Sequence, residues 1–204
     1  RRNPRRERDR EHRQQHRQAV VVQPYAHAPR IAQMALVDKN SLKKYEDVAK
    51  YGLGGVLSGA GAKPTDNTAE GWQEMVGQIK SQANNSRLAV PILYGVDASH
   101  GHSNVPGATV FPHSIGLGAS GNEALVQDIA LATTREMQAT GVNWIFSPSL
   151  DAPEDIRWGR VYESFSSSPE LNGRLGSAFI EGAQQNSAKT MASAKHYLAT
   201  GSMQ

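Results

Sequence analysis

The nine residues "VDASHGHSN" at positions 96–104 bring one carboxylate and two histidines close together. They follow a plain apolar run, "VPILYG" at residues 90–95, which is typical of a strand buried on both faces. Carboxylates and imidazoles are strong hydrogen-bonding groups. Their position predicts a functional site directly after a strand.

Polar side chains also follow the next two predicted strands. "VNWIFSPS" at residues 142–149 leads into Asp151 and Arg160, and "TMASAKHYL" at residues 190–198 carries adjacent cationic and imidazole groups. In β/α barrels the functional groups stand at the carboxyl ends of the strands, which meet on one rim. We therefore expect four residues to share a site: Asp97, Arg160, Lys195 and His196.

This set suits a neutral ligand with many hydroxyl groups. A carboxylate accepts hydrogen bonds from sugar hydroxyls, Arg and Lys donate to their oxygens, and such charge-assisted bonds are strong. Asp97 argues against a purely anionic ligand. Each residue also has a structural interpretation: a turn cap for Asp97, an ordinary strand end for Lys195 and His196, and for Arg160 an ion pair with Asp155 or Glu163.

Three other side chains leave two interpretations open. His100 and His102 form an H-x-H pattern, but zinc needs a third ligand and supporting groups, so we expect these histidines to brace the loop and predict no metal site. Trp158 is either an aromatic platform for a sugar face or a core residue.

Apolar runs and helical patterns alternate along the chain. Predicted strands cover residues 54–59, 90–97, 142–149 and 190–198, and predicted helices cover 67–86, 122–141 and 168–185. Thr68 or Asn67 is expected to cap the first helix, and Leu125, Ile129 and Met137 are expected to share one face of the second. This order favours an α/β fold with parallel strands and a partial TIM-type (β/α)8 barrel, with the site at the carboxyl ends.

Charge is unevenly placed along the chain, whose formal net charge is +3. Residues 1–30 carry most of the arginine and are expected to form a disordered basic arm. A nucleic-acid partner is disfavoured, because Glu7, Asp9 and Glu11 interrupt the basic cluster. No apolar run reaches the roughly 18 residues of a membrane span, and none suits a signal peptide, so localisation stays open. The chain contains no cysteine, which excludes disulfides and thiolate sites.

Longer segments carry a family resemblance. "ILYGVDASHGHSNVPGATVFPHSIGLGAS", "DIRWGRVYESF" and "SAKHYL" resemble the N-terminal barrel of glycoside hydrolase family 3, in its β-glucosidase and glucan exo-hydrolase branch. The family pattern reads roughly YG-[IV]-D-A-x-HG, FPH-x-IGLG, RWGR-x-YE and AKH-[FY], and all four blocks occur here in order. The resemblance covers about residues 32–198, and we assign residues 31–204 to this domain.

The resemblance implies a retaining β-glycosidase that works through two carboxylates and a covalent glycosyl-enzyme, without a cofactor. The substrate it implies is a β-glucoside or β-glucan oligosaccharide with a terminal non-reducing β-D-glucosyl residue. Asp97, Arg160, Lys195 and His196 would then bind the hydroxyls of that residue. Members of the family are often periplasmic or secreted.

The sequence also departs from the family pattern. The S-D-W-like segment that carries the family nucleophile does not occur here, and the acid/base usually comes from a second domain. We therefore expect both groups to lie outside this chain and the barrel to be incomplete at its C-terminus, as in a truncated or frame-disturbed gene product. A partial barrel would leave two long parallel edges, which predicts self-association. The alternatives are a non-catalytic carbohydrate-binding domain and a basic-arm protein that interacts with nucleic acid.

Overall fold

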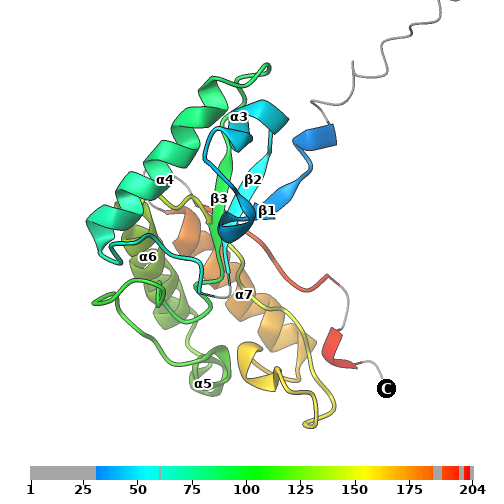
Figure 1. Cartoon of the computed structure of the whole chain (residues 1–204). Helices are drawn as coiled ribbons and strands as arrows, with labels where there is room; N and C mark the ends of the chain where they lie inside the picture. The colour runs from blue at the N-terminus through cyan, green and yellow to red at the C-terminus, as the bar shows by residue number, and fades with distance from the viewer. Residues whose placement is uncertain (1–30, 60, 186–189, 198–199, 203–204) are drawn as a thin grey trace, which may run out of the picture.

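The computed structural model describes residues 31–59, 61–185, 190–197 and 200–202 (Figure 1). The predicted basic arm at residues 1–30, and with it the nucleic-acid hypothesis, lies outside the described residues. Within the described part, no helix is long and apolar enough to cross a membrane.

Five short parallel strands form one sheet in the order β1-β2-β3-β4-β5. They are β1 (Leu36–Asp38), β2 (Gly55–Ser58), β3 (Leu93–Val96), β4 (Trp144–Ile145) and β5 (Met191–Ala192). The crossovers between them contain α3 (Asp47–Tyr51), α4 (Ala69–Asn84), α5 (Ser114–Ser120), α6 (Glu123–Ala139) and α7 (Pro169–Gln184). Three 3-10 turns complete the described elements: η1 (Lys39–Ser41), η2 (Val161–Glu163) and η3 (Thr200–Ser202).

The strand order distinguishes a barrel from other α/β folds. Each strand pairs with the next strand in the sequence, and the order never reverses as it does in doubly wound sheets. Right-handed crossovers then place the helices on one face, and Figure 1 shows α4, α6 and α7 gathered along one side of the strands. The α/β class and the parallel sheet are confirmed, and the described strands form part of a barrel without closing it. The first strand, β1, lies before residues 54–59, the first segment in which the apolar pattern predicted a strand.

The long helices begin where capping residues occur in the sequence. Thr68 caps α4 as predicted, because its side chain accepts a hydrogen bond from the Gly71 amide. Asn122 and Ser168 cap α6 and α7 in the same way. The predicted buried face of α6 was wrong at one position, since Leu125 is 42% exposed while Val126 is fully buried. The face that packs is therefore rotated toward the residue after Leu125.

The two faces of the sheet differ in burial. In the register of the strands, Val56 lies beside Tyr94 and Val96 lies beside Ile145, and all four side chains have zero exposure because they pack into the core with the helices. On the opposite face, which we call the inner face, Trp144 lies between Gly95 and Met191. The Trp144 ring packs edge-on against Phe146, and its Nε1 donates to Ser193 Oγ at 2.8 Å.

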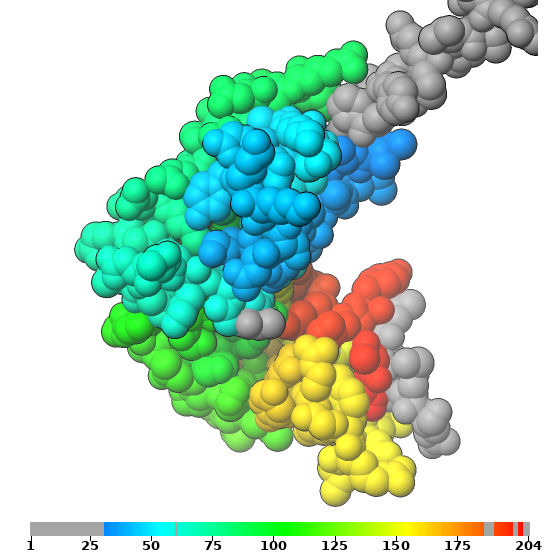
Figure 2. Space-filling view, in the orientation of Figure 1, coloured from blue at the N-terminus to red at the C-terminus, as the bar shows by residue number. Residues whose placement is uncertain are grey.

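The inner face is partly open. Leu36 on β1 is 43% exposed and Met191 on β5 is 45% exposed. These strands form the two edges of the sheet, and Figure 2 shows the surface hollowed between the blue segment that carries β1 and the red segment that carries β5. The expectation of two long edges was wrong, because β1 has three residues and β5 has two. The exposed apolar surface is on the inner face rather than along extended edges.

Candidate sugar-binding site

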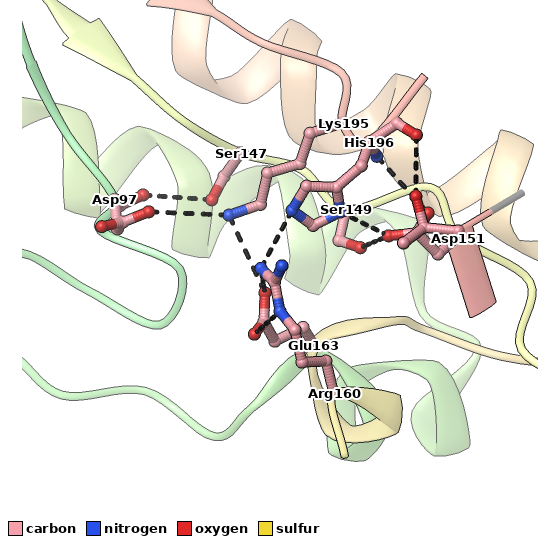
Figure 3. A network of polar contacts seen from close by, with 9 residues as sticks. Asp97, Ser147, Ser149, Asp151, Arg160, Glu163, Lys195 and His196 are labelled. Atoms are coloured by element: carbon pink, nitrogen blue, oxygen red, sulfur yellow. Dashed lines mark hydrogen bonds and ion pairs between the residues drawn. The ribbon is translucent and has the colours of Figure 1, made fainter. Parts of the chain in front are cut away.

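The carboxyl ends of β3, β4 and β5 carry the predicted site residues to one place (Figure 3). Asp97 follows β3 directly, and Lys195 and His196 follow β5. Arg160 reaches the same place from the long loop after β4, where it immediately precedes η2. All four residues that the sequence assigned to one rim therefore contact a common network of side chains.

Arg160 and Lys195 are organised by one carboxylate, Glu163. The Arg160 guanidinium donates from Nε and Nη2 to the two oxygens of Glu163, both at 2.7 Å. Lys195 Nζ lies 3.8 Å from Glu163 and 3.7 Å from Asp97 Oδ1, so the ammonium is shared between two carboxylates (Figure 3). Of the two ion pairs that the sequence offered for Arg160, the one with Glu163 is formed, while Asp155 pairs with Arg157.

His196 is held by a second carboxylate, Asp151. His196 Nδ1 lies 2.7 Å from Asp151 Oδ2, and Ser149 Oγ donates to the same oxygen at 2.7 Å. On the other side of the ring, Nε2 lies 2.9 Å from Arg160 Nη2. The network thus runs without a break from buried Asp151 through His196 and Arg160 to Glu163 and Lys195.

The carboxylates that organise the site are stabilised in their charged form. Burial by itself would raise the pKa of Asp151, but hydrogen bonds from His196 and Ser149 outweigh it, and the pKa is lowered. The hydrogen bonds from Arg160 are the largest cause that lowers the pKa of Glu163, and they outweigh its partial burial. Both groups therefore remain hydrogen-bond acceptors at neutral pH, which does not suit a general acid.

Asp97 is the most open member of the set. Its side chain is 64% exposed, whereas that of Lys195 is 14% exposed. Ser147 donates to the Asp97 carbonyl at 3.2 Å, which ties the end of β3 to the loop after β4. Beside Lys195 lies a small cavity of about 10 Å³, close to the room that one water needs, and its walls carry several hydroxyl groups: Ser99, Ser114, Ser147 and Ser149.

The two loop histidines support structure. His102 is 1% exposed, its Nε2 lies 2.9 Å from Thr140 Oγ1, and its ring packs edge-on against Trp72. Burial lowers the pKa of His102 to about 4, so the ring is neutral at physiological pH. The His100 ring packs at a tilt against His113, which in turn packs against Tyr162, so the loop after β3 is braced against η2. Among the described residues, no group of three His, Cys, Asp or Glu side chains could hold a metal ion.

Trp158 lies in the loop that carries Arg160 and is half-buried. Gly201 packs so closely against its ring that an added Cβ would lie 2.8 Å from Trp158 Cε3. Part of the ring is thus covered by the chain itself.

The sequence grouped Asp97, Arg160, Lys195 and His196, but it did not predict that two carboxylates hold the network together. Glu163 was expected only as one of two possible ion-pair partners of Arg160, and Asp151 only as a polar residue after the third predicted strand, because a sequence does not show which carboxylates lie beside which cations. One signal was available. Glu163 stands three residues after Arg160, in the spacing of a local ion pair.

Comparison with known proteins places this geometry in a family. The family model described as "Glycosyl hydrolase family 3 N terminal domain" matches residues 28–204, which is most of the chain. The chain belongs to glycosyl hydrolase family 3. The four sequence blocks that resembled this family therefore indicated it correctly, and the network at the carboxyl ends of β3, β4 and β5 lies within its N-terminal domain.

Relatives in family 3 are glycoside hydrolases of several specificities. The lysosomal beta glucosidase of Dictyostelium discoideum is 32% identical over 136 residues, which are 62% of this chain and 17% of that protein. The periplasmic beta-glucosidase of Salmonella typhimurium is 32% identical over 123 residues, 58% of this chain and 15% of that protein. The chain thus spans less than a fifth of the length of these relatives.

A solved structure shows the same fold. The exo-1,3/1,4-beta-glucanase of a Pseudoalteromonas species superposes with a TM-score of 0.82 at 35% identity, over 90% of this chain and 25% of that chain. A beta-glucosidase of Listeria innocua, whose structure was solved in complex with laminaribiose, gives a TM-score of 0.66 at 29% identity over 85% of this chain and 25% of that one.

Proposed function

We propose that this chain forms the sugar-binding part of a β-glucosidase-type glycoside hydrolase, which acts on terminal non-reducing β-D-glucosyl residues. The observation that carries the proposal is the joining of Asp97, Arg160, Lys195 and His196 into one network at the carboxyl ends of three neighbouring strands. A carboxylate beside fixed cationic donors offers the mixed set of acceptors and donors that hydroxyl groups require.

In this proposal Asp97 accepts hydrogen bonds from sugar hydroxyls, because its carboxylate is the exposed acceptor of the set. Lys195 and Arg160 donate to hydroxyl oxygens, while Glu163 keeps both cations in place. The nucleophile and the acid/base are supplied by residues outside this sequence. The relatives support the substrate class, since those compared include beta-glucosidases and a beta-glucanase that acts on 1,3/1,4 linkages.

The test is binding of glucose and of laminaribiose to the purified chain, measured by calorimetry. We expect Asp97→Asn to weaken binding by about tenfold, as expected for loss of one charged hydrogen bond. Asp155→Asn is the matched control, because Asp155 lies on the same rim loop but pairs with exposed Arg157. Equal affinity of the wild type and Asp97→Asn would contradict the proposed site.

Hydrolysis of an aryl β-glucoside separates binding from catalysis. We expect no turnover by the purified chain above that of an Asp97→Asn sample from the same host. Turnover that depends on Asp97 would show that a carboxylate within the chain acts as nucleophile, and it would overturn the placement of the reacting groups elsewhere.

We also propose that the chain associates with itself when it is present alone. The inner face of the sheet exposes apolar side chains at both edges, Leu36 on β1 and Met191 on β5. Neither edge strand pairs with a further strand among the described residues. Unpaired backbone beside apolar surface favours association with another sheet.

A further inference from the structure

Both ring nitrogens of His196 are engaged by groups from the loop after β4. Nδ1 lies 2.7 Å from Asp151 Oδ2, and Nε2 lies 2.9 Å from Arg160 Nη2. A guanidinium carries only donors, so Nε2 must accept from Arg160. An ionised carboxylate carries only acceptors, so Nδ1 must carry the proton. The two partners together fix a neutral ring with its proton on Nδ1.

Asp151 is anchored more firmly than the other ring partner. It is 2% exposed, and its Oδ2 also accepts from Ser149 Oγ at 2.7 Å. Its backbone carbonyl accepts from Asn172 Nδ2 at 2.8 Å, which ties it to helix α7. By contrast, the Arg160 side chain is 44% exposed. The carboxylate is therefore the buried partner of the ring, and the guanidinium, which Glu163 holds, is the partner that a ligand can reach.

We propose that Asp151 is a positioning residue: it keeps the His196 proton on Nδ1, so that Nε2 accepts a hydrogen bond from one hydroxyl of the bound sugar. The inference rests on the proposed sugar-binding function. A hydroxyl suits this place because it can insert between Nε2 and Arg160, donating to the first and accepting from the second. A hydrogen, a fluorine or a methoxy group at the same ring position cannot donate, so the site selects for a free hydroxyl.

The first measurement is the tautomer itself, read from 15N chemical shifts of the histidine rings in the full chain. His196→Gln identifies the His196 signals by their loss. We expect the Nδ1-protonated form in the wild type and a mixture in Asp151→Ala, while the control Asp155→Asn keeps the wild-type signals. An Nε2-protonated ring in the wild type would overturn the proposal without any sugar present.

The second measurement uses glucose and its singly deoxygenated and deoxyfluorinated analogues. We expect one ring position at which both analogues bind the wild type about tenfold more weakly than glucose, the size of one lost hydrogen bond. In Asp151→Ala this preference should fall to within about twofold. Equal binding of every fluoro analogue and glucose would overturn the selection for a donating hydroxyl.

Two further arms keep the outcomes separate. If Asp151→Ala does not fold, Ser149→Ala tests the same support, because it removes one bond to Asp151 and leaves the carboxylate; it should partly relax the tautomer and the hydroxyl preference. If no sugar binds the wild type, the proposed function and the hydroxyl selection both fail. The 15N spectra still decide whether Asp151 sets the tautomer.

Discussion

Glu163 contacts two of the four proposed sugar-binding residues, Arg160 at 2.7 Å and Lys195 at 3.8 Å. Without it, two cations would stand side by side next to the ligand position and repel each other. Asp151 has the corresponding role for His196. At the scale of single residues, the proposed site therefore consists of four groups placed to meet a ligand and of two carboxylates, Asp151 and Glu163, that hold three of them in place.

Acid should weaken the fold through these carboxylates. Because the pKa values of Asp151 and Glu163 are lowered in the fold, their stabilising contribution is complete above the ordinary values of 3.8 and 4.5 and is lost as the pH falls through the lower folded values. Glu163→Gln should lessen the loss of stability between about pH 5 and pH 3 in urea unfolding experiments. Asp155→Asn is the control, since its ion pair is exposed and screened.

At the scale of elements, α6 and α7 pack directly against each other through small residues. Gly182 on α7 lies so close to the backbone of α6 that an added Cβ would clash with the carbonyl oxygen of Gln127. Gly173 on the same helix is exposed and has open space around it. Gly182 therefore allows the two helices to pack closely, whereas Gly173 has no such role. Nothing in the sequence distinguishes the two positions.

Alanine at these two positions should change stability in opposite directions. Gly182→Ala forces α6 and α7 apart and should destabilise by about 1–3 kcal/mol, as overpacking usually does. Gly173→Ala should stabilise by about 0.5–1 kcal/mol, because alanine has the higher helix propensity and meets no neighbour. The midpoints of urea unfolding measure both. Stabilisation by Gly182→Ala would show that the two helices pack less closely than the structure indicates.

At the scale of the whole molecule, the two faces of the sheet differ. The helix-covered face is fully buried at Val56, Tyr94 and Ile145, while the inner face is open at its edges (Figure 2). A closed barrel would bury both faces, because its interior is filled with side chains. The five described strands bury the helix-covered face at β2, β3 and β4, while the inner face stays open at its edges.

Light scattering of the purified chain should therefore report a mass that rises with protein concentration. Leu36→Lys and Met191→Lys place a charge on the inner face and should shift the chain toward monomer. Leu125→Lys is the matched control, because Leu125 is equally exposed but lies on the outer surface of α6. A monomer at every concentration, with cooperative unfolding, would contradict the proposed self-association.

The sequence by itself determined the α/β class, the alternation of the longer strands and helices, and which four polar residues come together. The alternation of apolar runs with helical patterns predicted the parallel α/β fold, because burial imposes a different period on strands and helices. The Thr68 cap was predicted because its hydrogen bond is made within four residues. Asp97, Arg160, Lys195 and His196 could be grouped because parallel strands end on the same rim.

Only the tertiary structure decided how those residues are held. Asp151 lies 45 residues from His196 along the chain, and nothing local marks it as the carboxylate that contacts the imidazole. Leu125 and Val126 are both apolar, and the packing of α6 decided which one is buried. In each case the outcome depends on contacts between segments far apart in the sequence, whose geometry is set by the packing of the whole domain and not by local pattern.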